Sequence, residues 1–145
     1  TPDSISYRFG DAVFVGDTLF APLAGTARCD FPGASAAALY HSIQRLYSLP
    51  DATRVFLAHD YPAEAQEPVS HTTIGAEKSA NIHVRAETTE PEFVALRTQR
   101  DATLSVPKLL WPALQVNIRG GRLPPPETGD QAYLRIPLAS EGFET

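Results

Sequence analysis

The stretch "VFVGDTLFAPLAGTARCDF", from Val13 to Phe31, decides the fold. Its first residues are β-branched or aromatic, which is typical of a buried strand, and this strand pattern ends at Asp17. A loop of mostly small residues follows and carries Arg28 and Cys29. A carboxylate at the end of a buried strand is costly unless it is paired or binds a metal, yet aspartate is also a common turn residue. Asp17 alone therefore leaves a metal ligand and a turn residue both open.

The residues on either side of this stretch predict an α/β layer. "ISYRFGDAVF" predicts a hairpin that turns at Gly10, so the strand leading to Asp17 has a neighbour. Residues 34–49 predict an amphipathic helix with Ser35 as its N-cap and Pro50 as its stop.

A second buried strand is predicted at residues 55–58, and it leads directly into His59, Asp60 and Tyr61. A strand, a loop, a helix and a further strand in this order predict an α/β or α+β fold. Polar residues then gather at the strand ends, where such layers usually bind ligands.

The rest of the chain gives weaker patterns. We expect a loop at residues 62–70 and a helix around 74–80. "TTEPEFVALRTQRDA" predicts a surface helix, because Thr89 and Glu92 have capping-box spacing and Phe93, Leu96 and Arg100 share a face. A short apolar segment follows Pro107, the prolines 124–126 are extended, and "QAYLRIPL" predicts a small edge strand or a tail. We therefore expect one domain over residues 1–145, with 124–145 as an extended tail.

Composition excludes several classes of protein. The formal net charge is -5 and the basic residues are scattered, which argues against a nucleic-acid partner. No apolar run approaches the roughly 20 residues of a membrane helix, so we expect no membrane partner. Cys29 is the only cysteine, which excludes an intrachain disulfide and favours a cytoplasmic location.

Each candidate side chain also has a structural interpretation. His59 next to Asp60 fits either a ligand or a structural hydrogen bond, and Arg28 can bind an anion, pair with Asp30, or do both. Cys29 is better explained as a packed residue than as a nucleophile, because no base is near it in sequence.

The other histidines are weaker candidates for a functional site than His59. His41 fits a helix surface or a supporting role, and no role is predicted for His71 or His83. The sequence has no G-x-S-x-G, H-E-x-x-H, C-x-x-C, Walker or G-x-G-x-x-G motif, so classical serine hydrolases, zincins and nucleotide-binding folds lose support.

Taken together, "GDTLF", "ARCDF", "LYHSI", "LP" and "AHDY" resemble the C-terminal half of a metallo-β-lactamase-fold protein. They are most similar to the persulfide dioxygenases and the bacterial β-lactamase-like hydrolases, which are relatives of glyoxalase II. The resemblance runs from residue 1 to about 68 and continues more weakly to about 123. It implies an αββα sandwich of two similar halves with the metal site between them. The family's H-x-H-x-D-H motif is absent from this chain, so the missing N-terminal half becomes an expected partner.

The resemblance also implies site residues. Asp17 matches a metal-binding carboxylate, and His59 matches a second-metal ligand of the hydrolases or a histidine beside the iron of the dioxygenases. Tyr61 and Arg28 match substrate-binding residues, although Ala27 and Cys29 replace a glycine and a threonine next to that arginine. Asn117 and Arg119, in "QVNIRGG", match possible pocket residues.

The implied activity is an Fe(II)-dependent persulfide dioxygenase that oxidises glutathione persulfide, or a similar thiol persulfide, to sulfite. One alternative is a dinuclear zinc hydrolase of glyoxalase II type. Another is a catalytically incomplete half that acts only as a structural or partner module. We expect the chain alone to bind metal weakly, and to associate with the missing half or with a second copy through its uncovered apolar face.

Overall fold

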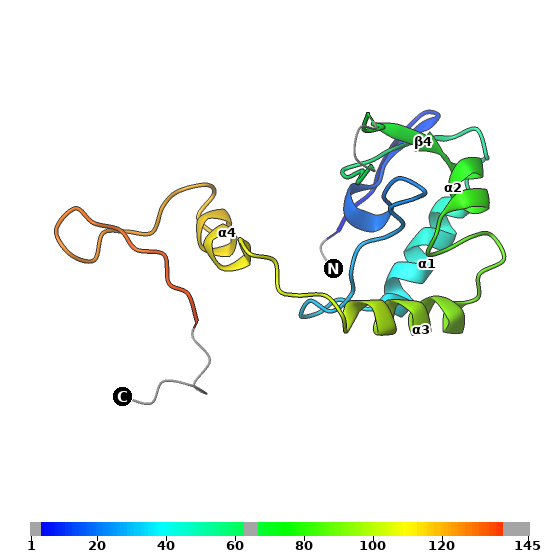
Figure 1. The fold of residues 1–145 in the computed structure, drawn as a ribbon. Helices are drawn as coiled ribbons and strands as arrows, with labels where there is room; N and C mark the ends of the chain where they lie inside the picture. The colour runs from blue at the N-terminus through cyan, green and yellow to red at the C-terminus, as the bar shows by residue number, and fades with distance from the viewer. Residues whose placement is uncertain (1–3, 63–66, 138–145) are drawn as a thin grey trace. The chain divides into compact units, whose positions relative to one another are not determined.

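The computed structural model describes residues 4–62 and 67–137. The chain divides into two compact units, Thr1–Leu104 and Ser105–Thr145 (Figure 1). The single domain expected from the sequence stays a prediction.

The larger unit is built on a four-stranded sheet in the order β1-β2-β3-β4. Its strands are β1 (Tyr7–Phe9), β2 (Ala12–Phe14), β3 (Arg54–Phe56) and β4 (His71–Thr73). β1 and β2 form the predicted antiparallel hairpin, β2 and β3 are parallel, and β4 is antiparallel to β3. The sequence predicted neither β4 nor the early end of β3, whose ladder stops at Phe56 rather than at residue 58.

Three helices complete this unit, namely α1 (Ala36–Tyr47), α2 (Ile74–Ala80) and α3 (Glu90–Asp101). All three were predicted, and their caps follow the sequence signals. The Ser35 hydroxyl accepts a hydrogen bond from the Ala38 amide at 3.2 Å, and Thr89 and Glu92 form the expected capping box.

The core lies between the sheet and these helices (Figure 1). Val13 and Val55 point inward from the two central strands and pack in one cluster with Ile43 of α1, Ile74 of α2 and Phe93 of α3. All five side chains are almost fully buried. Because α1 connects two parallel strands, it must cross over the sheet, and its apolar stripe covers the face beneath it.

The opposite face of the sheet carries an uncovered row of aromatic side chains. Tyr7, Phe14, Phe56 and His71 are direct neighbours across the four strands and form what we call the aromatic row. Phe14 stacks on Phe56 with 4.8 Å between ring centroids, and Phe56 stacks on His71 at 5.5 Å. Tyr7 is 58% exposed and Phe14 is 44% exposed. The two central strands are therefore apolar on both faces, with Val13 and Val55 on one and Phe14 and Phe56 on the other, which is typical of a sheet covered on both sides.

The smaller unit holds α4 (Leu110–Asn117), followed by a turn at Gly120 and Gly121. Residues 124–137 carry only an isolated bridge between Thr128 and Gln131, so the edge strand suggested for "QAYLRIPL" is absent from residues 131–137. The side chain of Gln115 bonds both backbone groups of Arg135 and thus ties this segment to α4. The end of the predicted tail, 138–145, lies outside the described residues.

Among residues 4–62 and 67–137, no helix combines the length and the apolar character needed to span a bilayer.

Candidate functional site

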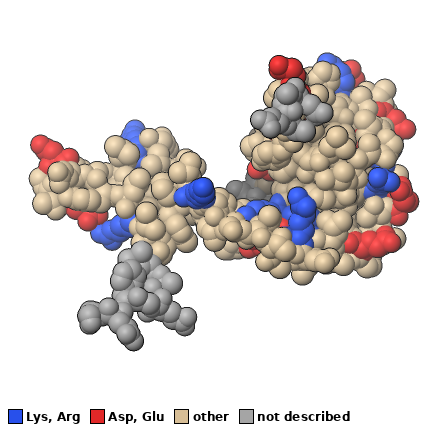
Figure 2. Space-filling view, in the orientation of Figure 1, with Lys and Arg blue, Asp and Glu red and all other residues tan. Residues whose placement is uncertain are grey.

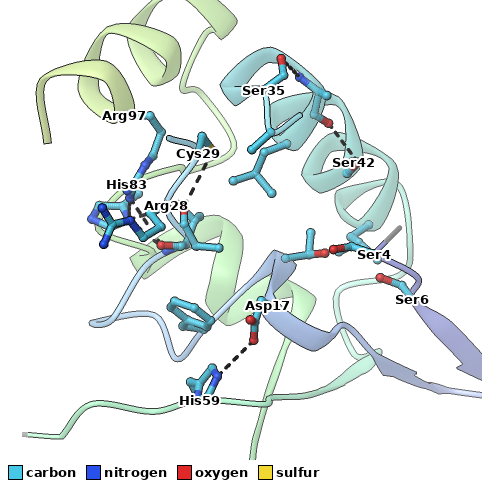
Figure 3. Close-up of a pocket in the computed structure, with 18 of the residues that line it drawn as sticks. Ser4, Ser6, Asp17, Arg28, Cys29, Ser35, Ser42, His59, His83 and Arg97 are labelled. Carbon is cyan, nitrogen blue, oxygen red and sulfur yellow. Dashed lines mark hydrogen bonds and ion pairs between the residues drawn. The ribbon is translucent and has the colours of Figure 1, made fainter. Parts of the chain in front are cut away.

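Asp17 and His59 meet at the edge of the sheet where the two central strands end. Asp17 lies in the one-turn 3-10 helix η1 (Gly16–Thr18), just after β2, and not at the strand end as the sequence suggested. His59 follows β3 by three residues. Because β2 and β3 are parallel neighbours, their carboxyl ends lie together, and His59 Nε2 approaches Asp17 Oδ1 to 3.2 Å (Figure 3). The pair remains accessible, with 59% of the Asp17 side chain and 47% of the His59 side chain exposed.

Aromatic rings hold the histidine in place. Tyr61 stacks on His59 with 5.8 Å between centroids, and Phe20 meets both rings edge-on at 5.4 and 5.7 Å. Tyr61 thus lies beside His59 and lines the same pocket, and its role in substrate binding stays a prediction.

Arg28 lies on the loop between residues 25 and 31, on another wall of this pocket. Its guanidinium forms two hydrogen bonds with Asp30, at 2.6 and 2.5 Å, and lies over the ring of Phe31. These bonds from Arg28 hold the pKa of the Asp30 carboxyl below its ordinary value. The structure thus shows the Arg28–Asp30 ion pair and places Arg28 in the pocket lining, and the binding of an anion by Arg28 stays a prediction.

Cys29 is half-buried, and burial raises the pKa of its thiol. A raised pKa lowers the thiolate fraction, which supports a packed residue over a nucleophile.

The pocket has a volume of about 1040 Å³, and arginines outnumber carboxylates in its lining. Among the described residues, Asp17 is the only carboxylate in the lining, whereas five arginines reach it: Arg8, Arg28, Arg45, Arg97 and Arg100. Arg28 and Arg97 are paired with Asp30 and Asp101, which lie outside the lining. The whole chain, by contrast, has a net charge of -5. On the visible face of the larger unit, some basic side chains lie together in its lower middle, and others lie at the rim beside acidic side chains (Figure 2). The lining therefore suits an anionic ligand.

Behind the Arg28 loop lies a buried polar network that sequence reasoning missed. His83 and Asp101 accept hydrogen bonds from the Thr26 and Cys29 amides at 2.9 and 2.7 Å, and Arg97 pairs with Asp101. His83, Arg97 and Asp101 are each at most 6% exposed. Burial, together with the charges of Arg97 and Arg100, lowers the pKa of His83 to about 4.

A second part of this network lies on α2. Asn81 donates to Glu77 at 2.7 Å and to the Gly25 carbonyl at 3.2 Å. Glu77 is fully buried, and this burial raises its pKa to about 7.

A weak signal for the network was present in the sequence. Phe93, Arg97 and Asp101 are spaced by four residues and share one face of α3, whereas Arg100, which was expected beside Phe93, is exposed. The charges made this face look like a surface. The inward side of α3 is instead a phenylalanine followed by an ion pair.

Asp17 and His59 provide an oxygen and a nitrogen donor that suit Fe(II) or Zn(II). In the described parts of the chain, no three His, Cys, Asp or Glu side chains are grouped so as to hold a metal ion. Two donors alone are too few for a stable metal site, and a metal-binding role for Asp17 and His59 stays a prediction. Asn117 and Arg119 belong to the smaller unit, and their place in the pocket stays a prediction.

Comparison with known proteins gives close relatives. No family model matches the chain. A protein of Xylella fastidiosa (strain 9a5c) named "Beta-lactamase hydrolase-like protein" is 55% identical over 140 residues, which are 96% of this chain and 32% of that protein. One of Burkholderia pseudomallei (strain 1710b), named "Probable metallo-hydrolase", is 53% identical over 88% of this chain and 43% of its own length. A hydroxyacylglutathione hydrolase of Synechococcus sp. (strain CC9902) is 36% identical over 64% of this chain and 46% of its own.

Solved structures show the same similarity as the sequence relatives. The crystal structure of ETHE1 from Myxococcus xanthus has a TM-score of 0.70 and 38% identity, over 84% of this chain and 50% of that one. A metallo-β-lactamase from Staphylococcus aureus, at 24% identity and a TM-score of 0.52 over 66% of this chain and 28% of its own, shows the fold alone. The chain has the metallo-β-lactamase fold.

The chain spans about a third to a half of the length of these curated relatives. It corresponds to the C-terminal half of the metallo-β-lactamase fold, as the sequence motifs implied. The name "Probable metallo-hydrolase" of the Burkholderia relative implies a metal cofactor without deciding between iron and zinc.

Proposed function

We propose that the protein containing this chain is an iron-dependent persulfide dioxygenase acting on glutathione persulfide or a similar anionic thiol persulfide. The observation that carries this proposal is the Asp17–His59 pair at one end of a pocket lined by five arginines. Similarity to ETHE1 and to a hydroxyacylglutathione hydrolase supports a metal enzyme with a thiol substrate.

In the proposed reaction, the persulfide, dioxygen and water yield the thiol and sulfite. The bond between the two sulfurs breaks, and the outer sulfur gains three oxygen atoms, two from dioxygen and one from water. Four electrons pass from that sulfur to dioxygen, and two protons are released with sulfite. An iron ion ligated by Asp17 would supply the open positions at which sulfur and oxygen meet.

The residues of this chain bind and orient the reactants. Nε2 of His59 lies 3.2 Å from Oδ1 of Asp17 and is placed to direct the carboxylate, as outer partners of metal ligands commonly do. Arg28 presents a cation to the carboxylates of the thiol carrier, and Tyr61 provides an exposed phenol beside His59.

The test is oxygen uptake by the full-length, iron-loaded protein with glutathione persulfide as substrate. We expect one iron per chain, uptake matched by sulfite formation, and loss of both iron and uptake in Asp17→Ala. His59→Ala should retain the iron and lose part of the rate. Bound iron without uptake would remove the proposal.

A dinuclear zinc hydrolase is the second candidate, because the same 3.2 Å approach would let Asp17 bridge two metals while His59 binds one of them. In that case the protein hydrolyses a glutathione thioester, holds two zinc ions, and loses one of them in His59→Ala. Metal content and the choice of substrate separate the two candidates. Failure of both activities in the full-length protein would promote the third, a purely structural half.

We further propose that the aromatic row packs against the remaining half of the protein. The relatives are two to three times longer than the matched region, and both faces of the sheet are apolar. A second sheet on this face would bury the rings, and it would bring further metal ligands to the strand ends that carry Asp17 and His59. Self-association through this face is the competing outcome, and sedimentation of the full-length protein distinguishes them.

A further inference from the structure

The loop that carries Arg28 is held by its backbone. The Gly25 carbonyl accepts from Asn81, the Thr26 amide donates to His83, and the Cys29 amide donates to Asp101. All three partners are buried side chains that follow α2 or belong to α3. The path of the loop is thus set by groups outside it.

His83 is the central partner. Its Nδ1 lies 2.9 Å from the Thr26 amide nitrogen and 3.3 Å from Nη1 of Arg97. Both of these groups can only donate, so Nδ1 must accept, and the ring carries its hydrogen on Nε2. The low pKa of His83 agrees with this neutral form at physiological pH.

The fit between the loop and the ring is close. Gly25 has a φ of +84°, and a Cβ on it would lie 2.2 Å from Nδ1 of His83. Arg97 also donates to the Thr26 carbonyl at 3.4 Å, so both backbone groups of Thr26 are bonded. Nδ1 of His83 and both backbone groups of Thr26 are thus bonded inside a buried cluster, as in a support for a functional loop. Nε2 of His83 and Nε of Arg97 are buried there without a hydrogen-bond partner among the described residues.

We propose that His83, together with Asp101, is a positioning residue that fixes the backbone of residues 25–29 and thereby directs Arg28 to the anionic substrate (Figure 3). The effect on substrate rests on the proposed function, in which Arg28 contacts the thiol carrier. The effect on the loop does not, because it concerns the Thr26 and Cys29 amides alone.

Two substitutions of His83 separate the hydrogen bond from mere packing. His83→Phe keeps a ring of similar size and removes the acceptor, whereas His83→Asn keeps an acceptor near the position of Nδ1. His41→Phe is the matched control, because His41 is an exposed histidine of α1 that pairs with Glu90 and lies outside the pocket lining. The experiment uses the full-length, metal-loaded protein with glutathione as the probe.

We expect the Thr26 amide to exchange its hydrogen at least about tenfold faster in His83→Phe, and near the wild-type rate in His83→Asn and His41→Phe. Glutathione affinity should fall about tenfold in His83→Phe with the metal content unchanged. His83→Asn should restore most of the affinity. Unchanged exchange at Thr26 in a folded His83→Phe protein would overturn the proposal.

A double-mutant cycle tests whether His83 acts through Arg28. Arg28→Met should weaken glutathione binding by at least as much as His83→Phe, and the double variant should be no weaker than Arg28→Met alone. Additive losses would show that His83 acts by another route and would contradict the proposal. If the wild-type protein bound no glutathione, the substrate assignment would fail, and amide exchange would still decide the role of His83 in the loop.

Discussion

Replacing Glu77 by glutamine should stabilise the protein in a pH-dependent way. Glu77 is fully buried, one of its oxygens accepts from Asn81, and the other, Oε1, has no hydrogen-bond partner. Burial raises its pKa from the ordinary 4.5 to about 7, so the fold favours the protonated acid. Between these two pH values the folded state holds more protons than the unfolded chain, and the free energy of unfolding falls as pH rises.

The size of the effect follows from the two pKa values. At about 1.4 kcal/mol per pKa unit, a rise from 4.5 to about 7 corresponds to about 3 kcal/mol of stability that is present below pH 4.5 and lost above pH 7. Glutamine is neutral throughout. Glu77→Gln should therefore be about 3 kcal/mol more favourable at pH 8 than at pH 4.5, whatever constant packing cost it adds.

Urea unfolding of the wild-type and variant proteins at pH 4.5, 6 and 8 measures this difference. Glu92→Gln is the matched comparison with the opposite sign, because hydrogen bonds from the side chain and amide of Thr89 lower the pKa of Glu92. The stability that these bonds give is present above the ordinary pKa and is lost as pH falls, so Glu92→Gln should be most harmful near neutral pH. A Glu77→Gln effect that is equal at all three pH values would refute the assignment of Glu77 as a buried acid.

Three further predictions concern the fold. Gly25→Ala should lower the free energy of unfolding by at least about 3 kcal/mol, because the added Cβ would meet the His83 ring. Gly10→Ala is the control: Gly10 has a φ of +60° and open space around it, so the loss should be about 1 kcal/mol. Thermal unfolding compares the two variants, and equal losses would contradict the close fit at Gly25. Phe14→Ala should lower the free energy of unfolding of the full-length protein by about 3 kcal/mol if the aromatic row is covered there. If the row stays exposed, the loss should be under about 1 kcal/mol, and denaturant titration measures the difference. Ser35→Ala should cost about 1 kcal/mol by removing the α1 cap, and an unchanged unfolding midpoint would argue against it.

The elements that sequence patterns predicted best are those with local causes. The hairpin around Gly10, helix α1 with its Ser35 cap, and helix α3 with its capping box all rest on residues a few positions apart. Strand β4 was missed because its segment, His71–Thr73, is only three residues long and is followed directly by α2, although its two threonines favour extended backbone. Its pairing with β3 joins residues distant in the sequence and leaves no local pattern.

The residues of the candidate site also divide into those that local sequence patterns predicted and those that depend on distant contacts. Asp17, Arg28, His59 and Tyr61 were found because each follows a recognisable strand or motif, and the structure places all four around one pocket. Position along the chain gave no such clue for His83, which lies between helices. Its role depends on three contacts from Thr26 and Arg97, residues that are distant in the sequence.

Because β2 and β3 are parallel, the contact between the two predicted metal ligands depends on the order in which the chain folds. Asp17 and His59 are separated by about forty residues that include all of α1, and long loops of this kind close slowly because their entropy is lost before the contact forms. The hairpin and α1 need only local contacts and can form first. The Asp17–His59 pair can form only once α1 has crossed the sheet, so capture of a metal ion by this edge would report that the β2–α1–β3 crossover is complete.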